Sequence, residues 1–295
     1  MAVGLVDRAG TLRHQMRVPT PRSCATAGAP GTSNTAPGTS NTAAEALVWR
    51  ALAELIERVR VDVGADDRIV VCGAGCGGPM RGASVSPLNI PGWRNFPLQA
   101  RLQELTGLPT FVDNDAKALA LAEGWIGAAA GRQDFIAVVV STGVGGGLVL
   151  DGRLLGGRLG NAGHIGHVVV EPDGRTCTCG GRGCLEAEAS GTALAAVTGR
   201  PAEMAPPELV ERTGTLVGRA VASVVNLLDL PLAVVSGSVA LGFGEPFFRA
   251  AQREVDLRCG LDFARGARVL PGGLGDRGPL IGAGRVGWQG LEAST

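Results

Sequence analysis

Residues 160–186 read Gly-Asn-Ala-Gly-His-Ile-Gly-His-Val-Val-Val-Glu-Pro-Asp-Gly-Arg-Thr-Cys-Thr-Cys-Gly-Gly-Arg-Gly-Cys-Leu-Glu. Cys177, Cys179 and Cys184 lie within eight residues, among glycines that allow the backbone to turn tightly, and His167 precedes them. Three thiolates and one imidazole are a ligand set that favours tetrahedral zinc. The alternative is that the cysteines are small buried hydrophobic residues. Their clustering favours the zinc site.

The composition excludes several classes of protein. The chain has 295 residues, which favours two domains, and its 27 basic residues balance its 27 acidic ones. We therefore expect no nucleic-acid partner. No apolar segment is long enough to span a bilayer and no secretory signal opens the sequence, so we predict no membrane and a cytoplasmic location. The remaining cysteines are scattered, as expected for reduced thiols: Cys24, Cys72, Cys76 and Cys259.

Strands and helices are expected to alternate along the chain, which predicts an α/β protein. Two short strands come first, and a tandem heptapeptide at 29–42 is too polar to be buried and reads as a surface loop. Thr42 and Glu45 form a capping box at the start of a helix. The expected later strands are 68–75, 109–113, 135–141, 232–236 and 268–270, and the expected later helices are 97–106, 115–129, 185–197, 207–229 and one at the C-terminus.

Glycine-rich segments follow three of these strands and can present backbone N–H groups to phosphate. They are 75–78, the loop 142–147, and 237–238; each alone is weak evidence, because glycine turns also serve plain hairpins. Asp115, between a strand and a helix, fits a general base. A plain N-cap aspartate fits the same position.

Taken together, these motifs resemble the ROK family of bacterial sugar kinases and related repressors. The resemblance rests on Asn114-Asp115, segment 141–147, segment 163–167, the Cys-x-Cys-Gly-x-x-Gly-Cys-Leu-Glu run and segment 236–238. It implies a two-domain, actin-like, ribonuclease-H-like ATPase fold in which sugar and ATP meet in a cleft. The smaller domain is expected at 1–115 plus 276–295, and the larger at 116–275. The family's repressors carry a helix-turn-helix domain ahead of this core. None is found here, which favours a kinase.

The resemblance also implies roles for individual residues. Asp115 matches the base that deprotonates the 6-hydroxyl of a hexose, with glucose expected first and N-acetylmannosamine or another hexose next. His167 matches both a zinc ligand and a sugar contact. The cofactors implied are structural zinc and ATP with Mg²⁺, and a homodimer or homotetramer is expected. The other matching sugar positions are Asn89, Asn114, His164, Glu186, Gly77 and Gly78, and the matching nucleotide positions are Thr142, Gly143, Gly145, Gly146, Gly237 and Ser238.

Two features depart from the family pattern. His164 stands where the family usually has glutamate, and neutral imidazole both donates and accepts hydrogen bonds, so the identity of the hexose is open. The Asp-x-Gly-Gly-Thr phosphate motif and its strand are not found ahead of residues 1–7. We expect the codons upstream of Met1 to encode that motif. The alternative from another class is a sugar-binding protein with little or no kinase activity, and whether polyphosphate replaces ATP is also open.

Overall fold

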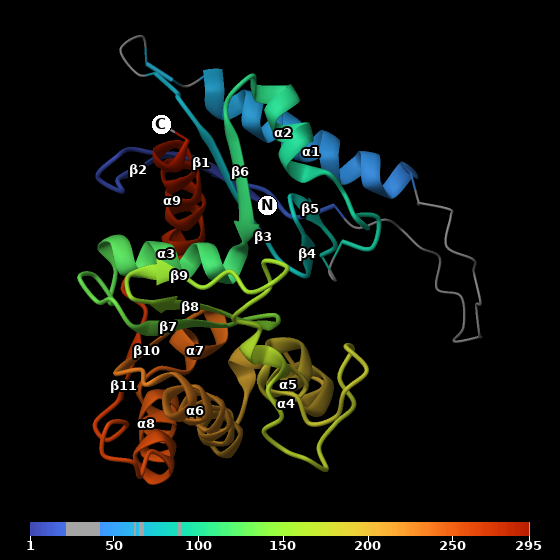
Figure 1. The fold of residues 1–295 in the computed structure, drawn as a ribbon. Coiled ribbons are helices and arrows are strands. Elements are labelled where there is room, and N and C mark those ends of the chain that lie inside the picture. Colours follow the sequence, from blue (N-terminus) through green and yellow to red (C-terminus); the bar gives the residue numbers. More distant parts are fainter. Residues whose placement is uncertain (22–41, 62, 65–67, 88–89, 295) are drawn as a thin grey trace.

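The structure is a computed structural model that describes residues 1–21, 42–61, 63–64, 68–87 and 90–294. Its strands and helices form two groups, one above and one below helix α3 (Asp115–Ile126) in Figure 1. We call the upper group the smaller lobe and the lower group the larger lobe. The division of the chain into domains at residues 115 and 275 stays a proposal.

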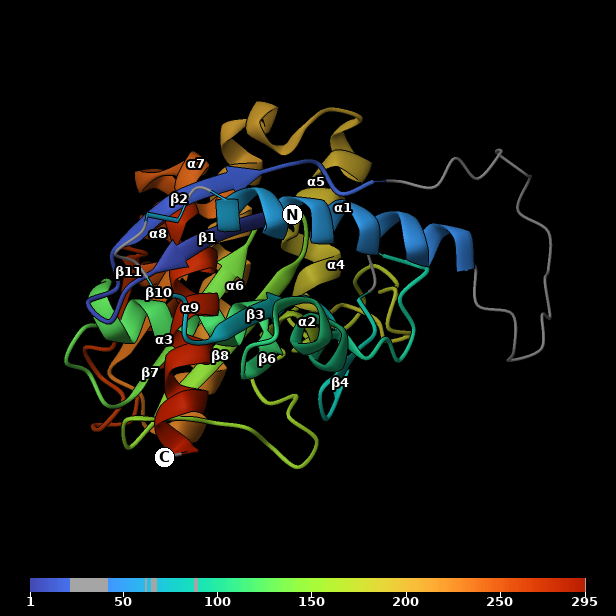
Figure 2. The same cartoon turned by 90° about the horizontal axis from the view of Figure 1, so that it is seen from above.

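In the described residues of the smaller lobe, three short pairs of strands are present. They are β1 (Ala2–Val6) antiparallel to β2 (Leu12–Arg17), β3 (Cys72–Cys76) parallel to β6 (Thr110–Asn114), and the hairpin β4 (Met80–Arg81) with β5 (Ser84–Val85). Its helices are α1 (Thr42–Val61), α2 (Leu98–Thr106) and α9 (Gly278–Ala293). Helix α1 lies beside β1 and β2, as the view from above also shows (Figure 2).

The larger lobe is built on one mixed sheet with the strand order β11-β10-β7-β8-β9. Strand β10 is parallel to β7 and β11, whereas β8 is antiparallel to β7 and β9. The strands are β7 (Phe135–Val140), β8 (Val144–Leu150), β9 (Arg153–Leu154), β10 (Leu232–Ser236) and β11 (Arg268–Pro271). The helices are α4 (Leu185–Ala189), α5 (Gly191–Thr198), α6 (Pro207–Leu228), α7 (Ser238–Phe243) and α8 (Glu245–Arg258).

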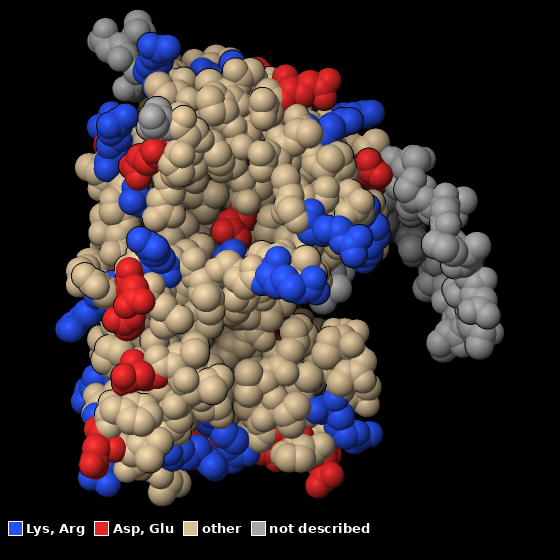
Figure 3. Space-filling view, in the orientation of Figure 1, with Lys and Arg blue, Asp and Glu red and all other residues tan. Residues whose placement is uncertain are grey.

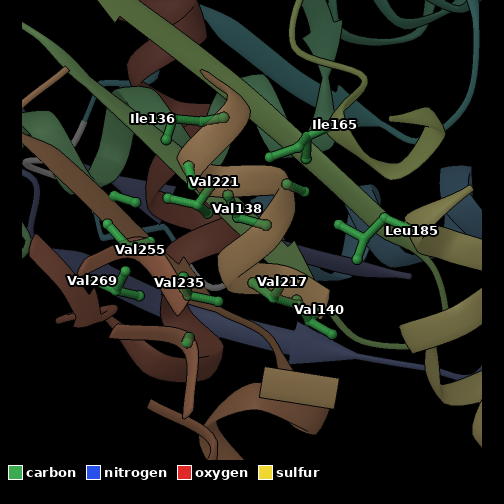
Figure 4. Packing of buried hydrophobic residues seen from close by; sticks show 14 of the residues in the cluster. Ile136, Val138, Val140, Ile165, Leu185, Val217, Val221, Val235, Val255 and Val269 are labelled. Carbon is green, nitrogen blue, oxygen red and sulfur yellow. The ribbon is translucent and has the colours of Figure 1, made fainter. Parts of the chain in front are cut away.

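The hydrophobic core of the larger lobe lies between this sheet and helix α6 (Figure 4). Ile136, Val138 and Val140 from β7 are fully buried and share one cluster with Val217 and Val221 of α6. Residues two apart in a strand point to the same face, and residues four apart in a helix lie on one stripe. These two periodicities bring the five side chains together. The core fixes β7, whose C-terminal end leads directly into the expected phosphate loop.

Most of the expected elements are confirmed, with three corrections. The strand expected at 68–75 begins only at Cys72. The loop expected at 142–147 is shorter, because β8 begins at Val144. The single helix expected at 185–197 is wrong: Ser190 has an extended backbone, and its hydroxyl accepts a hydrogen bond from Ala193 N at 3.1 Å, which starts a second helix. The loop expected at 29–42 falls almost wholly outside the described residues.

The surface agrees with the balanced composition. Basic and acidic side chains are interspersed on the face shown in Figure 3. Within the described ranges, none of the helices has the length and apolarity needed to cross a bilayer.

Candidate active site

The site is centred on the junction between β6 and α3. Asn114 ends the strand in an extended conformation, and its side-chain oxygen accepts hydrogen bonds from Ala116 N and Lys117 N. Asn114 is therefore the N-cap of α3, and the interpretation of Asp115 as the cap is wrong. The side-chain nitrogen of Asn114, Nδ2, also donates a hydrogen bond to Gly78 O at 3.3 Å. Asn114 thus links the helix start to the glycine turn after β3.

Asp115 is the first residue of α3 and lies on the wall of a cavity. Its surface is exposed within that cavity, but protein surrounds it closely, and the resulting loss of solvation raises the pKa of its carboxyl group above the ordinary value. A Cβ atom on Gly77 would lie 3.0 Å from Asp115 Oδ2, so a larger residue at position 77 would press on the carboxylate in its present position. Burial, and then the nearby Asp115 charge, raises the pKa of the Cys76 thiol to about 12.

Two of the predicted sugar residues, His164 and Glu186, belong to one electrostatic group with Asp115, because the Asp115 and Glu186 charges both act on His164. Burial and then His167 lower the pKa of His164, while Asp115 and Glu186 act in the opposite direction. The His164 and His167 rings are 6.2 Å apart between centroids. Val144 N donates to Glu186 Oε2 at 2.9 Å. The lowered pKa keeps His164 neutral at pH 7, so its ring can both donate and accept a hydrogen bond.

The predicted metal ligands converge as a group of four. The candidate ligand atoms of His167, Cys177, Cys179 and Cys184 all lie within 4.8 Å of one another. Cys177 Sγ is 3.8 Å from His167 Nδ1, and Cys179 Sγ is 3.8 Å from Cys184 Sγ. Bonds of 2.0–2.3 Å to a tetrahedral zinc place the ligand atoms at about such separations. The donor set and its spacing therefore fit zinc.

The two predicted nucleotide segments lie side by side in the larger lobe. Ser141 Oγ and Ser238 Oγ are 2.9 Å apart and share a hydrogen bond. Thr142 is anchored through its carbonyl oxygen, which accepts from Thr192 Oγ1 at 2.9 Å. Gly237 has a φ of 101°, a conformation that favours glycine. These turns leave Thr142 and Gly143 at one end of the sheet, next to Ser238.

Gly145 and Gly146 were expected in a phosphate-binding loop, but the structure places them in a strand. Gly145 and Gly146 lie inside β8, paired with Val139 and Val138, rather than in a phosphate loop. A Cβ on Gly145 would lie 3.0 Å from Ala116 Cβ, and one on Gly146 would lie 3.0 Å from Gly163 O. Their small size lets β8 approach α3 and the turn before His164. A phosphate contact by either residue stays a prediction, and Asn89 lies outside the described residues.

The sequence reading missed two polar residues that hold this site together. Lys117 is only 4% exposed, and its Nζ lies 2.7 Å from Asp113 Oδ1 and 3.1 Å from Gly160 O. Asn161 bonds through its side chain to the backbone of Met80. A lysine that precedes the apolar run 118–122 of a helix could have signalled the first. No local pattern identifies the second, because its partner is 81 residues away.

A cavity of about 770 Å³ separates β1 from β3 in the smaller lobe. In the part of the chain that the structure describes, β1 is paired only with β2, and β3 only with β6. The facing edges of both strands line the cavity, together with apolar side chains such as Leu52, Ile56 and Trp93, and Asp115 lies on its wall. Two strand edges thus face each other across the cavity with no ladder between them.

The fold and the site define a mixed α/β protein with the actin-like ATPase fold, which the matching hexokinase structures share. The chain belongs to the ROK family, because residues 1–286 match the sequence model of that family. The ROK hexokinase of Thermus thermophilus is 32% identical with a TM-score of 0.77, covering 99% of this chain and 100% of that one. The Streptomyces griseus ROK glucokinase, solved with glucose and AMPPNP, is 26% identical with a TM-score of 0.75, covering 97% and 95%.

The curated relatives have two different substrates in their names. The N-acetylmannosamine kinase of Salmonella arizonae is 32% identical over 259 residues, which are 83% of this chain and 81% of the relative. The N-acetylmannosamine kinase of Citrobacter koseri is 42% identical over 176 residues, and the match spans 60% of its length. The Thermotoga maritima glucokinase is 51% identical over 106 residues, and the match spans 33% of its length.

Proposed function

We propose that this protein transfers the γ-phosphoryl group of ATP to the 6-hydroxyl group of a hexose. The observation that carries the proposal is the Asp115 carboxylate, which lies at the strand–helix junction with a raised pKa and with His164 and Glu186 nearby. Membership of the ROK family supports the same reaction. A cytoplasmic location and a homodimer or homotetramer stay predictions.

In the proposed reaction, Asp115 accepts the proton of the sugar hydroxyl as that oxygen forms a bond to the γ-phosphorus. The bond between that phosphorus and the leaving ADP oxygen breaks, giving hexose 6-phosphate and ADP. A raised pKa makes the carboxylate a better proton acceptor near neutral pH. Thr142, Gly143, Gly237 and Ser238 are the proposed ATP-binding residues. Mg²⁺ supplies charge neutralisation on the phosphates when it is bound with ATP.

A zinc ion held by His167, Cys177, Cys179 and Cys184 is part of the proposal. The four ligand atoms lie close enough to share one ion. With all four positions filled by protein, the role of the ion would be structural. Burial raises the pKa of the Cys184 thiol to about 12, and a bound cation would reverse that effect. Metal binding through one His167 nitrogen would fix the ring and leave its other nitrogen for a sugar hydroxyl.

Glucose is the substrate expected from sequence alone, and N-acetylmannosamine is the second candidate. The second is favoured by relatives named N-acetylmannosamine kinases that align with 83% of this chain. His164 is the residue on which the choice would depend, because it replaces the glutamate usual in the family sugar motif. A neutral imidazole can donate to a carbonyl oxygen, which an ionised carboxylate cannot do. The acetamido group of N-acetylmannosamine offers such an oxygen.

We further propose that an additional strand carrying the Asp-x-Gly-Gly-Thr motif fits between β1 and β3. The cavity of about 770 Å³ and the two facing strand edges support this. Unpaired edges are ready to accept a strand. The test compares the chain as given with one extended by the codons upstream of Met1. Sugar binding in both but turnover only in the extended chain would support the strand. A stop codon or an unrelated sequence upstream, with little turnover, would favour the sugar-binding alternative.

The reaction itself is tested by coupled measurement of ADP release across a panel of hexoses, with the D115N variant and D262N as the matched control. Asp262 is 95% exposed in its side chain and pairs only with Arg265 on the surface of the larger lobe. We expect D115N to lose at least about 100-fold in kcat while retaining sugar-dependent melting shifts. D262N should behave as wild type. Substantial turnover by D115N would exclude Asp115 as the base.

A further inference from the structure

We propose that Asn161 is a positioning residue that clasps the smaller lobe onto the sugar-site segment of the larger lobe. The inference rests on the proposed function for its catalytic meaning. Asn161 Oδ1 accepts a hydrogen bond from Met80 N at 2.9 Å, and Asn161 Nδ2 donates to Met80 O at 2.9 Å. One side chain thus satisfies both backbone groups of a residue in β4. At neutral pH an amide side chain offers an uncharged acceptor and an uncharged donor in this paired geometry.

Met80 connects Asn161 to the hydrophobic core of the smaller lobe. Its side chain is 7% exposed and belongs to a cluster with Val85, Trp93 and Phe96. Just before it, Gly78 has a φ of 86°, and a Cβ atom there would lie 2.6 Å from Pro87 Cα. The hairpin therefore has little freedom to move independently of the core behind it.

Asn161 itself lies in a segment that is held on its other side by α3. Its neighbour Gly160 accepts the hydrogen bond from the buried Lys117, which is paired with Asp113. Two residues further on, Gly163 has a φ of 97° and a Cβ there would lie 2.5 Å from Gly146 O. His164 follows directly. The segment 160–164 is thus fixed to α3 by Lys117 and to the smaller lobe by Asn161.

These contacts connect the Gly78 turn with two segments that carry proposed site residues. Asn114 ties the Gly78 turn to the start of α3, and Asn161 ties the next residues of the same turn to the segment that carries His164. Asp115 directly follows Asn114, so the first of these two links lies beside the proposed base. Loss of the Asn161 clasp would free the hairpin and His164 to move apart. The expected effect is on sugar affinity more than on the chemical step, because Asn161 is not itself in contact with Asp115 by any hydrogen bond.

The test uses N161A and N161D, with N226A as the control. Asn226 also donates to a backbone carbonyl, that of Arg258, but this bond lies within the larger lobe. Hydrogen–deuterium exchange of residues 79–86 is measured without sugar or ATP, and KM and kcat for the sugar are measured separately. We expect N161A to exchange faster in this hairpin and to raise KM about tenfold, with kcat within about threefold. N161D keeps the size but removes the donor, and should be no better than N161A.

The exchange measurement separates this inference from the proposed function. If the wild-type protein turns over no sugar in either the given or the extended form, but N161A still exchanges faster at 79–86 than N226A, the proposed function fails and the clasp stands. Unchanged exchange in both Asn161 variants would overturn the clasp. Faster exchange with KM within twofold of wild type would overturn its positioning role. Should N161A fold poorly, N161D alone decides between these outcomes.

Discussion

Replacement of Glu188 by glutamine is expected to destabilise the protein by about 2 kcal/mol. Glu188 is 2% exposed and accepts hydrogen bonds from Arg175 N at 2.6 Å, Arg175 Nη2 at 2.9 Å and Arg212 Nη2 at 2.9 Å. Burial acts to raise its pKa, but the bonds from Arg175 and then Arg212 outweigh this and lower the pKa from 4.5 to about 2. Glu188 is part of α4, and its carboxylate binds both Arg175, two residues before Cys177, and Arg212 of α6. It therefore supports the proposed zinc site.

The magnitude follows from this difference in pKa. A shift from 4.5 to about 2 corresponds to about 3 kcal/mol, at roughly 1.4 kcal/mol per unit. The Arg175 and Arg212 side chains are 37% and 40% exposed, so solvent screening reduces the figure to about 2 kcal/mol. For a protein of this size that is a fall in Tm of about 5 °C. The loss should be smaller if the glutamine amide recovers part of the hydrogen bonding.

The pH dependence has a definite sign. Because the folded pKa is lowered, the stabilisation is fully present above pH 4.5 and is lost as the pH falls toward about 2. Calorimetric Tm values of wild type and E188Q should therefore differ at pH 7 and converge below pH 4.5. E211Q, on the exposed face of α6, is the control and should match wild type within about 1 °C. Equal Tm values at pH 7, or a difference that persists undiminished at pH 3, would refute the reasoning.

Three further predictions concern the site. Chelation of the proposed zinc should lower Tm and sugar affinity together, measured by calorimetry and by sugar-dependent melting shifts; a chelator that leaves both unchanged argues against the ion. The acid limb of kcat/KM should lie above the ordinary range for aspartate, because the raised pKa of Asp115 means that the base is lost as pH falls through that value; a limb near pH 3.8 would contradict this. G237A should lower Tm by several degrees, because φ is 101° and the new Cβ would lie 2.3 Å from Val140 O; an unchanged Tm in a thermal scan would argue otherwise.

The sequence alone predicted the features that depend on local patterns. The closely spaced Cys177, Cys179 and Cys184 predicted a cluster of candidate metal ligands, because ligands close in sequence can reach one ion with little chain between them. Short continuous apolar runs predicted strands β7 and β10, and a long segment with a proline start predicted helix α6. Asp115 was placed correctly at a helix start, although the sequence left open whether it was a general base or the N-cap.

Only the tertiary structure decided the features that depend on contacts between distant segments. It assigned the cap to Asn114, placed Gly145 and Gly146 within β8, and joined Ser141 to Ser238 across 97 residues. It also brought Asn161 to the backbone of Met80, a contact that no local motif encodes. The physical reason is that a hydrogen bond between two lobes depends on how whole sheets and helices pack, whereas a cap, a strand or a metal knot depends on a few neighbouring residues. Segment 160–186 could therefore be recognised from its own residues. The hydrogen bonds that connect it to Lys117 of α3 and to Met80 of β4 could not be predicted in this way.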